Sequence, residues 1–126
     1  MAAWILYHVP DLDRALAELA RVVKPGGRLV AATNAVDHLR ELWDLAGRAP
    51  SIERFPFRSE NGEEVLRRHF ARVERRDTCG SVTWDKKTIR RYVASWDDLA
   101  SLDMPLIHQP LRARCRSTVF VAEKAA

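Results

Sequence analysis

The chain has 126 residues, of which 47% are hydrophobic and 30% charged, and its formal net charge is +4. These values fit one globular domain and exclude a disordered or low-complexity chain. No apolar run approaches the roughly 18 residues of a membrane span, and the N-terminal residues lack the basic region and cleavage site of a secretory signal. We therefore expect a cytoplasmic protein in which Cys79 and Cys115 are free thiols.

The positive charge is concentrated in the second half of the chain. Residues 1–63 carry 8 basic and 9 acidic side chains, whereas residues 64–126 carry 13 basic and 8 acidic ones. A basic half can attract an anionic partner. More often such charges form a solvated helix face, which is the interpretation that we prefer.

The first third of the chain predicts a strand, a helix and a second strand. Residues 2–9, AAWILYHV, form an apolar run typical of a buried strand that leads into a loop. Residues 12–23 have the apolar spacing of an amphipathic helix, with Asp11 as its N-cap. Residues 28–34, RLVAATN, form a second buried strand. This order predicts two parallel strands joined by a right-handed crossover.

Gly26 and Gly27 separate the helix from the second strand. A phosphate-binding glycine loop leads from a strand into a helix, so that helix amides point at the anion. This pair leads from a helix into a strand, where carbonyl groups point outward. We therefore interpret it as a turn, in which one glycine takes the left-handed conformation that ends the helix.

The rest of the sequence predicts three helices and two strands. Trp43 stands at helical spacing and is expected in the core. The expected elements are helices over 36–47, 63–73 and 86–96 (the last capped by Asp85), strands over 73–84 and 114–124, and connectors over 48–62 and 97–111. We expect a single partial domain over 1–126, made of a βαβ unit (1–34), helices with a cap loop (35–72) and C-terminal strands with a helix (73–126).

The segment LYHVPDLDRALAELARVVKPGGRLVAATN resembles the second half of class I S-adenosylmethionine (SAM)-dependent methyltransferases of the type 11 group. In that family the fourth strand ends in an LYHV or LHHV turn, and R-V-L-K-P-G-G-R-L leads into the fifth strand. The final STVFVAEK resembles the closing antiparallel strand of the family. The resemblance, strongest over 3–34, implies an α/β fold: the C-terminal half of a Rossmann-like sheet, with strands resembling 4, 5, 6 and 7, the last antiparallel, and flanking helices.

The family holds SAM mainly with its first half, through a glycine-rich loop after strand one and acidic residues after strands two and three. None of these features occurs in this chain. The resemblance therefore implies a small-molecule methyltransferase present as a C-terminal fragment that binds SAM weakly or not at all and is inactive alone. The expected partners are a methyl acceptor once the domain is complete and, because a strand edge is unpaired, a missing N-terminal half or a second copy. We expect no membrane partner, and no metal, since the four histidines lack ligand spacing.

Candidate chemistry is expected where the two parallel strands end, because ligands of open α/β sheets bind beyond the carboxyl ends of the strands. The first strand is expected to end near Tyr7 and His8. The second ends near Thr33 and Asn34, with His38 one helical turn later. Tyr7, Thr33, Asn34 and His38 are thus candidate substrate-pocket residues, although Tyr7 also fits an ordinary core position.

His8 is the candidate catalytic residue, because an oxygen or nitrogen acceptor can need a general base. Its alternative role is to order the turn before Pro10. By resemblance, Ala3 and Trp4 match positions that line the methionine part of the cofactor, and their alternative role is core packing. Asn34 can bind substrate or cap the helix that follows it.

A non-enzymatic binding module is the alternative class of function. Trp84, Tyr92 and Trp96 lie among lysines and arginines, a composition that can hold RNA or an acidic protein. The sequence contains no recognised nucleic-acid motif, and these aromatic residues also fit a helix core. We therefore keep nucleic-acid binding as the second hypothesis.

Overall fold

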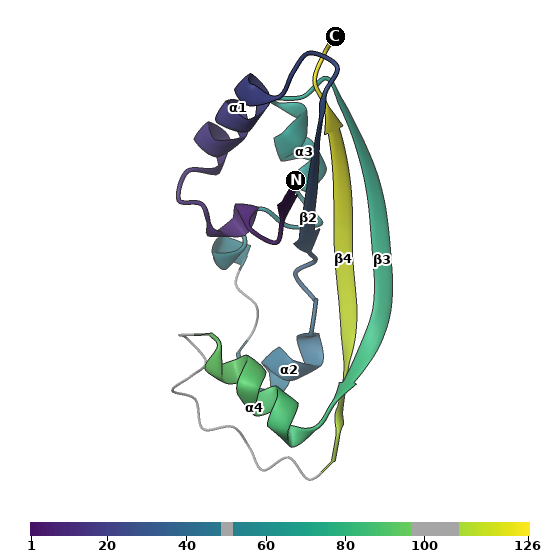
Figure 1. Cartoon of the computed structure of the whole chain (residues 1–126). Coiled ribbons are helices and arrows are strands. Elements are labelled where there is room, and N and C mark those ends of the chain that lie inside the picture. The colour runs from purple at the N-terminus through teal and green to yellow at the C-terminus, as the bar shows by residue number, and fades with distance from the viewer. Residues whose placement is uncertain (49–51, 97–108) are drawn as a thin grey trace. The chain divides into compact units, whose positions relative to one another are not determined.

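The computed structural model describes residues 1–48, 52–96 and 109–126. Most of the predicted connector 97–111 and three residues of the connector 48–62 lie outside the described residues. The elements, drawn in Figure 1, are β1 (Ala2–Ala3), the 3₁₀ helix η1 (Leu6–His8), α1 (Leu12–Val22), β2 (Arg28–Asn34), α2 (Arg40–Leu45), the 3₁₀ helix η2 (Ile52–Arg54), α3 (Gly62–Arg67), β3 (Arg72–Trp84), α4 (Lys86–Ala94) and β4 (Leu111–Glu123).

The four strands form one sheet in the order β1-β2-β4-β3. β1 and β2 are parallel, with Ala3 opposite Ala32. β2 and β4 are antiparallel over the whole length of β2. The predicted α/β fold, with a parallel first pair and an antiparallel last strand, is confirmed.

α1 begins and ends as its sequence predicts. The Asp11 carboxylate accepts a hydrogen bond of 3.0 Å from the backbone amide of Arg14, which caps the helix. Gly26 has a φ of +70°, the left-handed conformation that follows a helix end. A Cβ at Gly27 would lie 2.8 Å from the carbonyl oxygen of Lys24, so this position requires glycine. The glycine pair is therefore a turn, as predicted.

The described residues divide into two compact units, one drawn from Met1–Val36, Ser51–Thr78 and Arg116–Ala126 and the other from Asp37–Pro50 and Cys79–Cys115. We call them unit 1 and unit 2. β3 and β4 each contribute residues to both. The single domain over 1–126 stays a prediction.

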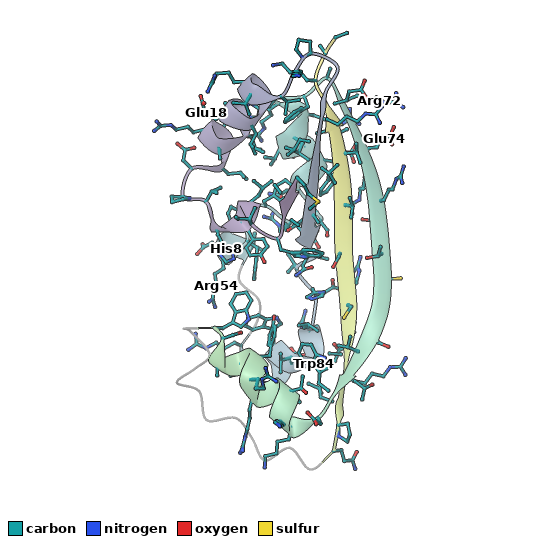
Figure 2. The ribbon with its side chains drawn as sticks, viewed as in Figure 1. His8, Glu18, Arg54, Arg72, Glu74 and Trp84 are labelled. Atoms are coloured by element: carbon teal, nitrogen blue, oxygen red, sulfur yellow. The ribbon has the colours of Figure 1, made fainter. Side chains whose placement is uncertain are left out.

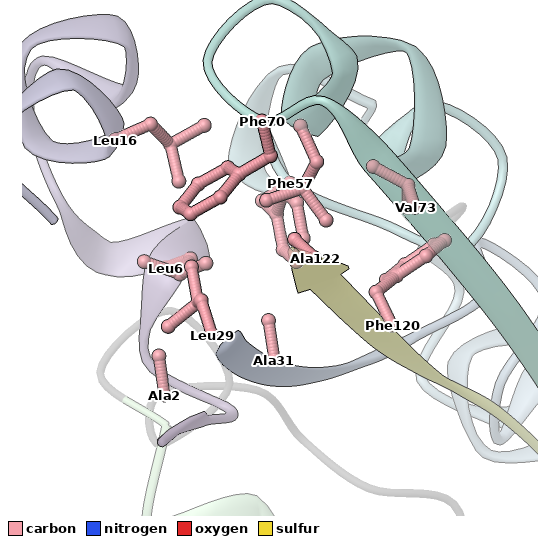
Figure 3. Packing of buried hydrophobic residues seen from close by; sticks show 11 residues of the cluster. Ala2, Leu6, Leu16, Leu29, Ala31, Phe57, Phe70, Val73, Phe120 and Ala122 are labelled. Atoms are coloured by element: carbon pink, nitrogen blue, oxygen red, sulfur yellow. The ribbon is translucent and has the colours of Figure 1, made fainter. Parts of the chain in front are cut away.

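The core of unit 1 lies between the sheet and the helices α1 and α3 (Figure 3). Asp13 on α1 contacts His69, two residues after the end of α3, with 2.8 Å between His69 Nε2 and Asp13 Oδ1. The rings of Phe57 and Phe120 meet edge to face at 5.7 Å. The buried cluster consists of Ala2, Leu6, Leu16, Leu29, Ala31, Phe57, Leu66, Phe70, Val73, Phe120 and Ala122.

Unit 2 has its own core between α2, α4 and the strand residues beside them. Asp85 caps α4 as predicted, since its carboxylate accepts a hydrogen bond of 2.7 Å from the Thr88 amide. Trp43 is buried, as expected. The buried cluster consists of Leu39, Leu42, Trp43, Ile89, Val93 and Ala113. None of the described helices combines the length and the apolar character needed to cross a membrane.

The first strand is much shorter than the predicted 2–9. It ends at Ala3, because Trp4 takes a φ of 51° and turns the chain away from the strand direction. Residues 6–8 then form η1, in which Leu6 is buried in the core of unit 1. Tyr7 and His8 therefore lie in a helical turn after β1 and not at the end of a strand.

The second and third predicted helices are also shorter than expected. α2 covers Arg40–Leu45 instead of 36–47, because Leu39 has a φ of 55° and interrupts helical geometry. α3 ends at Arg67 instead of residue 73. α4 covers Lys86–Ala94 instead of 86–96, and the final strand begins three residues earlier than predicted.

Candidate functional site at the ends of β1 and β2

The carboxyl ends of β1 and β2 lie side by side, because the two strands are parallel neighbours. Trp4 follows β1, and Asn34 is the last residue of β2. The Trp4 backbone amide donates to the carbonyl oxygen of Ala32 at 2.9 Å, which fixes the turn after β1. The Trp4 indole Nε1 donates to Oδ1 of Asn34, also at 2.9 Å. Two of the predicted site residues are thus in direct contact.

Asn34 connects three segments of unit 1. Its Oδ1 accepts a second hydrogen bond, of 2.8 Å, from the hydroxyl group of Ser117 on β4. Its backbone carbonyl accepts a hydrogen bond of 3.0 Å from the amide of Ser59. The interpretation of Asn34 as a helix cap is wrong, because α2 begins six residues later and its N-cap residue is Leu39.

The connector before α3 lies against the end of β2. The Thr33 hydroxyl donates to the carbonyl oxygen of Phe57 at 2.8 Å, and Thr33 is fully buried. The Thr33 hydroxyl is therefore occupied by a hydrogen bond within the fold, and it does not face an open pocket. Asn61 braces the same connector, accepting from the Arg58 amide at 2.9 Å and donating to the Pro56 carbonyl at 2.8 Å.

Ser59 is a candidate that the sequence did not indicate. It is only 4% exposed, and among the described residues its hydroxyl has no hydrogen-bond partner. A buried hydroxyl without a partner is uncommon in a folded protein. Its neighbour Glu60 accepts a hydrogen bond of 3.0 Å from the Val36 amide, so this carboxylate helps to hold the chain that leaves β2. A serine inside a proline-containing connector carries no periodic signal that would have revealed its position.

Tyr7 and His8 form an aromatic pair on the turn after β1, and Figure 2 labels His8 there. Their ring centroids are 4.4 Å apart. Tyr7 also meets the ring of Phe55 edge to face at 5.4 Å. Burial raises the pKa of the Tyr7 phenol above its usual 10.0, so Tyr7 is uncharged near neutral pH. His8 is exposed and available to solutes.

Ala3 and Trp4 are exposed, and 47% of the surface of Trp4 is accessible to solvent. Their alternative interpretation as core residues is therefore wrong. His38 lies in the turn before α2 and belongs to unit 2, so it does not occupy the helical position predicted for it. Tyr7 is half-buried and packs against the core of unit 1.

Aromatic residues of unit 2 line a shallow surface pocket of about 320 Å³, whose walls are Trp84, Thr88, Arg91 and Tyr92. The rings of Trp84 and Tyr92 lie 5.1 Å apart. The same rings pack against the core of unit 2, together with Trp96. The described residues contain no group of three or more His, Cys, Asp or Glu side chains able to hold a metal ion. Cys79 and Cys115 are free, as predicted.

Comparison with known proteins points to one family. Residues 1–31 match the family model of the methyltransferase domain, type 11. The fold is similar to the YcgJ protein of Bacillus subtilis, with a TM-score of 0.57 and 15% identity over 98% of this chain and 62% of that one. It is also similar to a candidate methyltransferase of Bacillus halodurans C-125, with a TM-score of 0.55 and 14% identity over 98% of this chain and 68% of that one. No curated protein matches.

These matches confirm the resemblance to class I SAM-dependent methyltransferases that residues 3–34 indicated. The sequence match ends at residue 31, and beyond it the likeness is one of fold. This chain spans less than two thirds of the first solved structure.

Proposed function

We propose that this chain is the C-terminal part of a SAM-dependent methyltransferase for a small molecule, and that it is inactive without the other part of the domain. The observation that carries the proposal is the contact between Trp4 and Asn34 at the carboxyl ends of two parallel strands. This is the place where open α/β sheets bind ligands. The match of residues 1–31 to a methyltransferase domain supports SAM as the cofactor.

The described residues at this place suit only the methionine part of SAM. They offer the exposed indole of Trp4, the amide of Asn34 and the buried hydroxyl of Ser59. The carboxylate of Glu60, the residue after Ser59, already accepts a hydrogen bond from the Val36 amide. Carboxylates that bind the ribose would have to come from elsewhere, as the resemblance implies. We therefore propose that the described residues at this place form only part of a cofactor site.

We propose that His8 acts as a general base that accepts a proton from the methyl acceptor. It is exposed, lies on the turn that follows β1 and contacts the tilted ring of Tyr7, whose phenol stays neutral. A histidine can accept a proton near neutral pH, as an oxygen or nitrogen nucleophile requires. Trp4 would form a wall of the cofactor pocket and Asn34 would fix the position of that wall.

The missing part would join at β1. This strand is at one end of the sheet order, so its outer edge pairs with no described strand. Met1, Trp4 and Ile5 are exposed beside that edge, at 96%, 47% and 54%. An open parallel edge with apolar neighbours is a surface on which another strand can pair. The free thiols of this chain favour a reducing compartment, the cytoplasm.

Joining the chain to the missing part tests the proposal. The segment that precedes the equivalent of β1 in the Bacillus halodurans structure would be fused before Ala2, and SAM binding would be measured by equilibrium dialysis. We expect saturable binding by the fusion that Trp4→Ala weakens at least about tenfold and Thr88→Ala does not. A fusion that folds, as judged by circular dichroism, and still binds no SAM would contradict the proposal.

The pocket of unit 2 supports the second candidate function, binding of RNA or an acidic protein. Trp84 and Tyr92 contribute aromatic rings to its walls, and Arg91 contributes a positive charge. Base stacking combined with cations is how single-stranded nucleic acid is held without a sequence motif. Titration with poly(U) at two salt concentrations tests this function. Binding that weakens steeply with salt would support it, and no binding at low salt would remove it.

A further inference from the structure

One face of the sheet in unit 1 is covered by helices and the other is not. α1 and α3 lie on the side that carries Leu29, Ala31 and Phe120, where Leu16 and Leu66 join the buried cluster (Figure 1). Side chains alternate across a strand, so the residues between these positions point to the opposite side. No described helix of unit 1 packs on that side. We call it the bare face.

The bare face is a ladder of four residue pairs, each made of one residue on β2 and one directly opposite on β4. Arg28 pairs with Glu123 in a 3.0 Å ion pair, and Asn34 pairs with Ser117 in a 2.8 Å hydrogen bond. Between these polar ends the pairs are aliphatic: Val30 with Val121 and Ala32 with Val119. The three valines are half-buried and do not belong to the core cluster.

Two further groups border the bare face. Ala3 lies in register with Ala32 and is exposed, so the apolar strip continues onto β1. On the β3 side, Glu74 pairs with Arg72 at 3.1 Å and with Arg76 at 3.8 Å. Figure 2 shows Arg72 and Glu74 pointing away from the helices. The face is thus an apolar strip between charged borders, which is the usual composition of a protein interface.

We propose that a second copy of this chain covers the bare face, with the two sheets packed face to face about a two-fold axis that runs along the strands between β2 and β4. In such a symmetric interface, residue i contacts residue j of the partner and residue j contacts residue i. The rotation exchanges the two members of every pair in the ladder. Val30 then lies over the partner's Val121, and Ala32 over the partner's Val119. The aliphatic rows form the dry centre, as in a β-sandwich.

Charge complementarity selects this arrangement. The same rotation places Arg28 over the partner's Glu123 and Glu123 over the partner's Arg28, so four charges alternate in sign at one end of the interface. At the other end an amide lies over a hydroxyl group, since Asn34 meets the partner's Ser117. A two-fold axis across the strands would instead place the Arg28 end over the Asn34 end and leave the charges unmatched. The ladder is therefore complementary to itself in one orientation.

This inference does not depend on methyl transfer. Asn34 lies at one end of the bare face and also at the proposed cofactor site, so a second copy on the bare face would cover one edge of that site. The dimer is the state of the chain by itself. Its absence would leave the proposed function untouched, and failure of SAM binding by the fusion would leave the dimer untouched.

Sedimentation equilibrium of the full chain tests the proposal. We expect a dimer at about 100 µM that dissociates on dilution toward the micromolar range. Val30→Lys and Val121→Lys each place a charge in the centre of the interface and should raise the dimer Kd at least about tenfold. Val22→Lys is the matched control, because Val22 is 62% exposed on α1, outside the bare face, and this variant should leave the Kd unchanged.

The ion pair gives a second test that does not rely on the apolar centre. Arg28→Glu places like charges at the end of the interface and should weaken the dimer, and the exchange Arg28→Glu with Glu123→Arg should restore it. Circular dichroism of every variant shows whether the fold is kept. A wild-type monomer at about 100 µM would overturn the proposal, as would lysine variants that dimerise like Val22→Lys. A monomer that sediments with phosphatidylglycerol vesicles would overturn it in favour of a bilayer as the occupant.

Discussion

The indole Nε1 of Trp4 donates a hydrogen bond of 2.9 Å to Oδ1 of Asn34, and this bond joins the ends of two parallel strands. The backbone of Trp4 takes a φ of 51° in this turn. A left-handed backbone at a residue other than glycine costs about 1 kcal/mol or more, so the surrounding contacts must stabilise it. The bond therefore both shapes the turn after β1 and presents an aromatic ring at the candidate site.

Replacing Asn34 tests this bond. Asn34→Ala removes the acceptor shared by Trp4 and Ser117 and should lower the free energy of unfolding by about 1–3 kcal/mol. Trp4→Phe removes one of the two bonds and should cost less, about 0.5–1.5 kcal/mol. Urea unfolding followed by circular dichroism measures both. Equal losses in the two variants would show that the Ser117 bond contributes nothing.

Gly62 tests the packing beneath the sheet. A Cβ at this position would lie 2.6 Å from Cζ of Phe120, whose side chain is fully buried. Gly62→Ala should therefore destabilise the chain by about 1–3 kcal/mol, although alanine favours helices. Gly80→Ala is the control, because no heavy atom lies within 4 Å of the added Cβ, and it should be neutral or slightly stabilising. Thermal unfolding of both variants tests this expectation. Equal melting temperatures would contradict the close packing of Gly62 against Phe120.

Glu41 makes the stability of unit 2 depend on pH. Its carboxylate accepts from the Arg114 backbone amide at 2.9 Å and from the guanidinium Nε at 3.0 Å. The hydrogen bond from the Arg114 backbone amide is the largest cause that lowers the pKa of Glu41 from 4.5 to about 2, and the backbone of Glu41 itself and the Arg114 guanidinium lower it further. Because the folded pKa is the lower one, this contribution is full above pH 4.5 and is lost as the pH falls toward 2.

In Glu41→Gln the melting temperature should therefore fall less between pH 4.5 and pH 2 than it does in the wild type. Arg114→Ala should change this pH dependence less than Glu41→Gln does, because the backbone amide that lowers the pKa of Glu41 most remains. Melting temperatures measured across this range give the comparison. If the melting temperature of Glu41→Gln falls with pH as much as that of the wild type, other carboxylates cause the loss of stability in acid.

The sequence predicted α1 and β2 well because several local signals agree there. Asp11 caps the helix, apolar residues recur at helical spacing, and Gly26 closes it. β2 has the predicted bounds, and α1 ends one residue early. The parallel pairing of β1 with β2 follows from the same order of elements. These features depend on neighbours in the sequence, which is why the sequence reveals them.

The segment after Ala3 was predicted wrongly for a physical reason. A short apolar run fits a buried strand and a buried helical turn equally well. Leu6 enters the core from a 3₁₀ turn, and Trp4 and Ile5 point to solvent instead of being buried. Leu39 shows the same limit, because its left-handed backbone follows from tertiary contacts and shortens α2.

The sequence predicted that the first two strands end side by side, but it put Tyr7 and His8 at the end of the first strand, where the structure has Trp4. The strand order places Trp4 near Asn34, but their bond spans 30 residues and depends on the backbone of Trp4. Ser59 reaches the end of β2 through a connector whose path no local pattern describes. The burial of Thr33 against Phe57 has the same origin. Contacts made by connectors are set by the whole fold, so sequence patterns miss them.

Calorimetric titration of the chain alone with SAM tests the central claim, that this chain carries one part of a methyltransferase and not a complete cofactor site. Circular dichroism first establishes that the chain is folded. We predict no saturable heat, corresponding to a Kd weaker than about 1 mM. A saturable heat with a Kd near 1 µM would contradict the claim. It would mean that the chain builds the whole site itself, and Trp4→Ala would then show whether the site lies at the ends of β1 and β2.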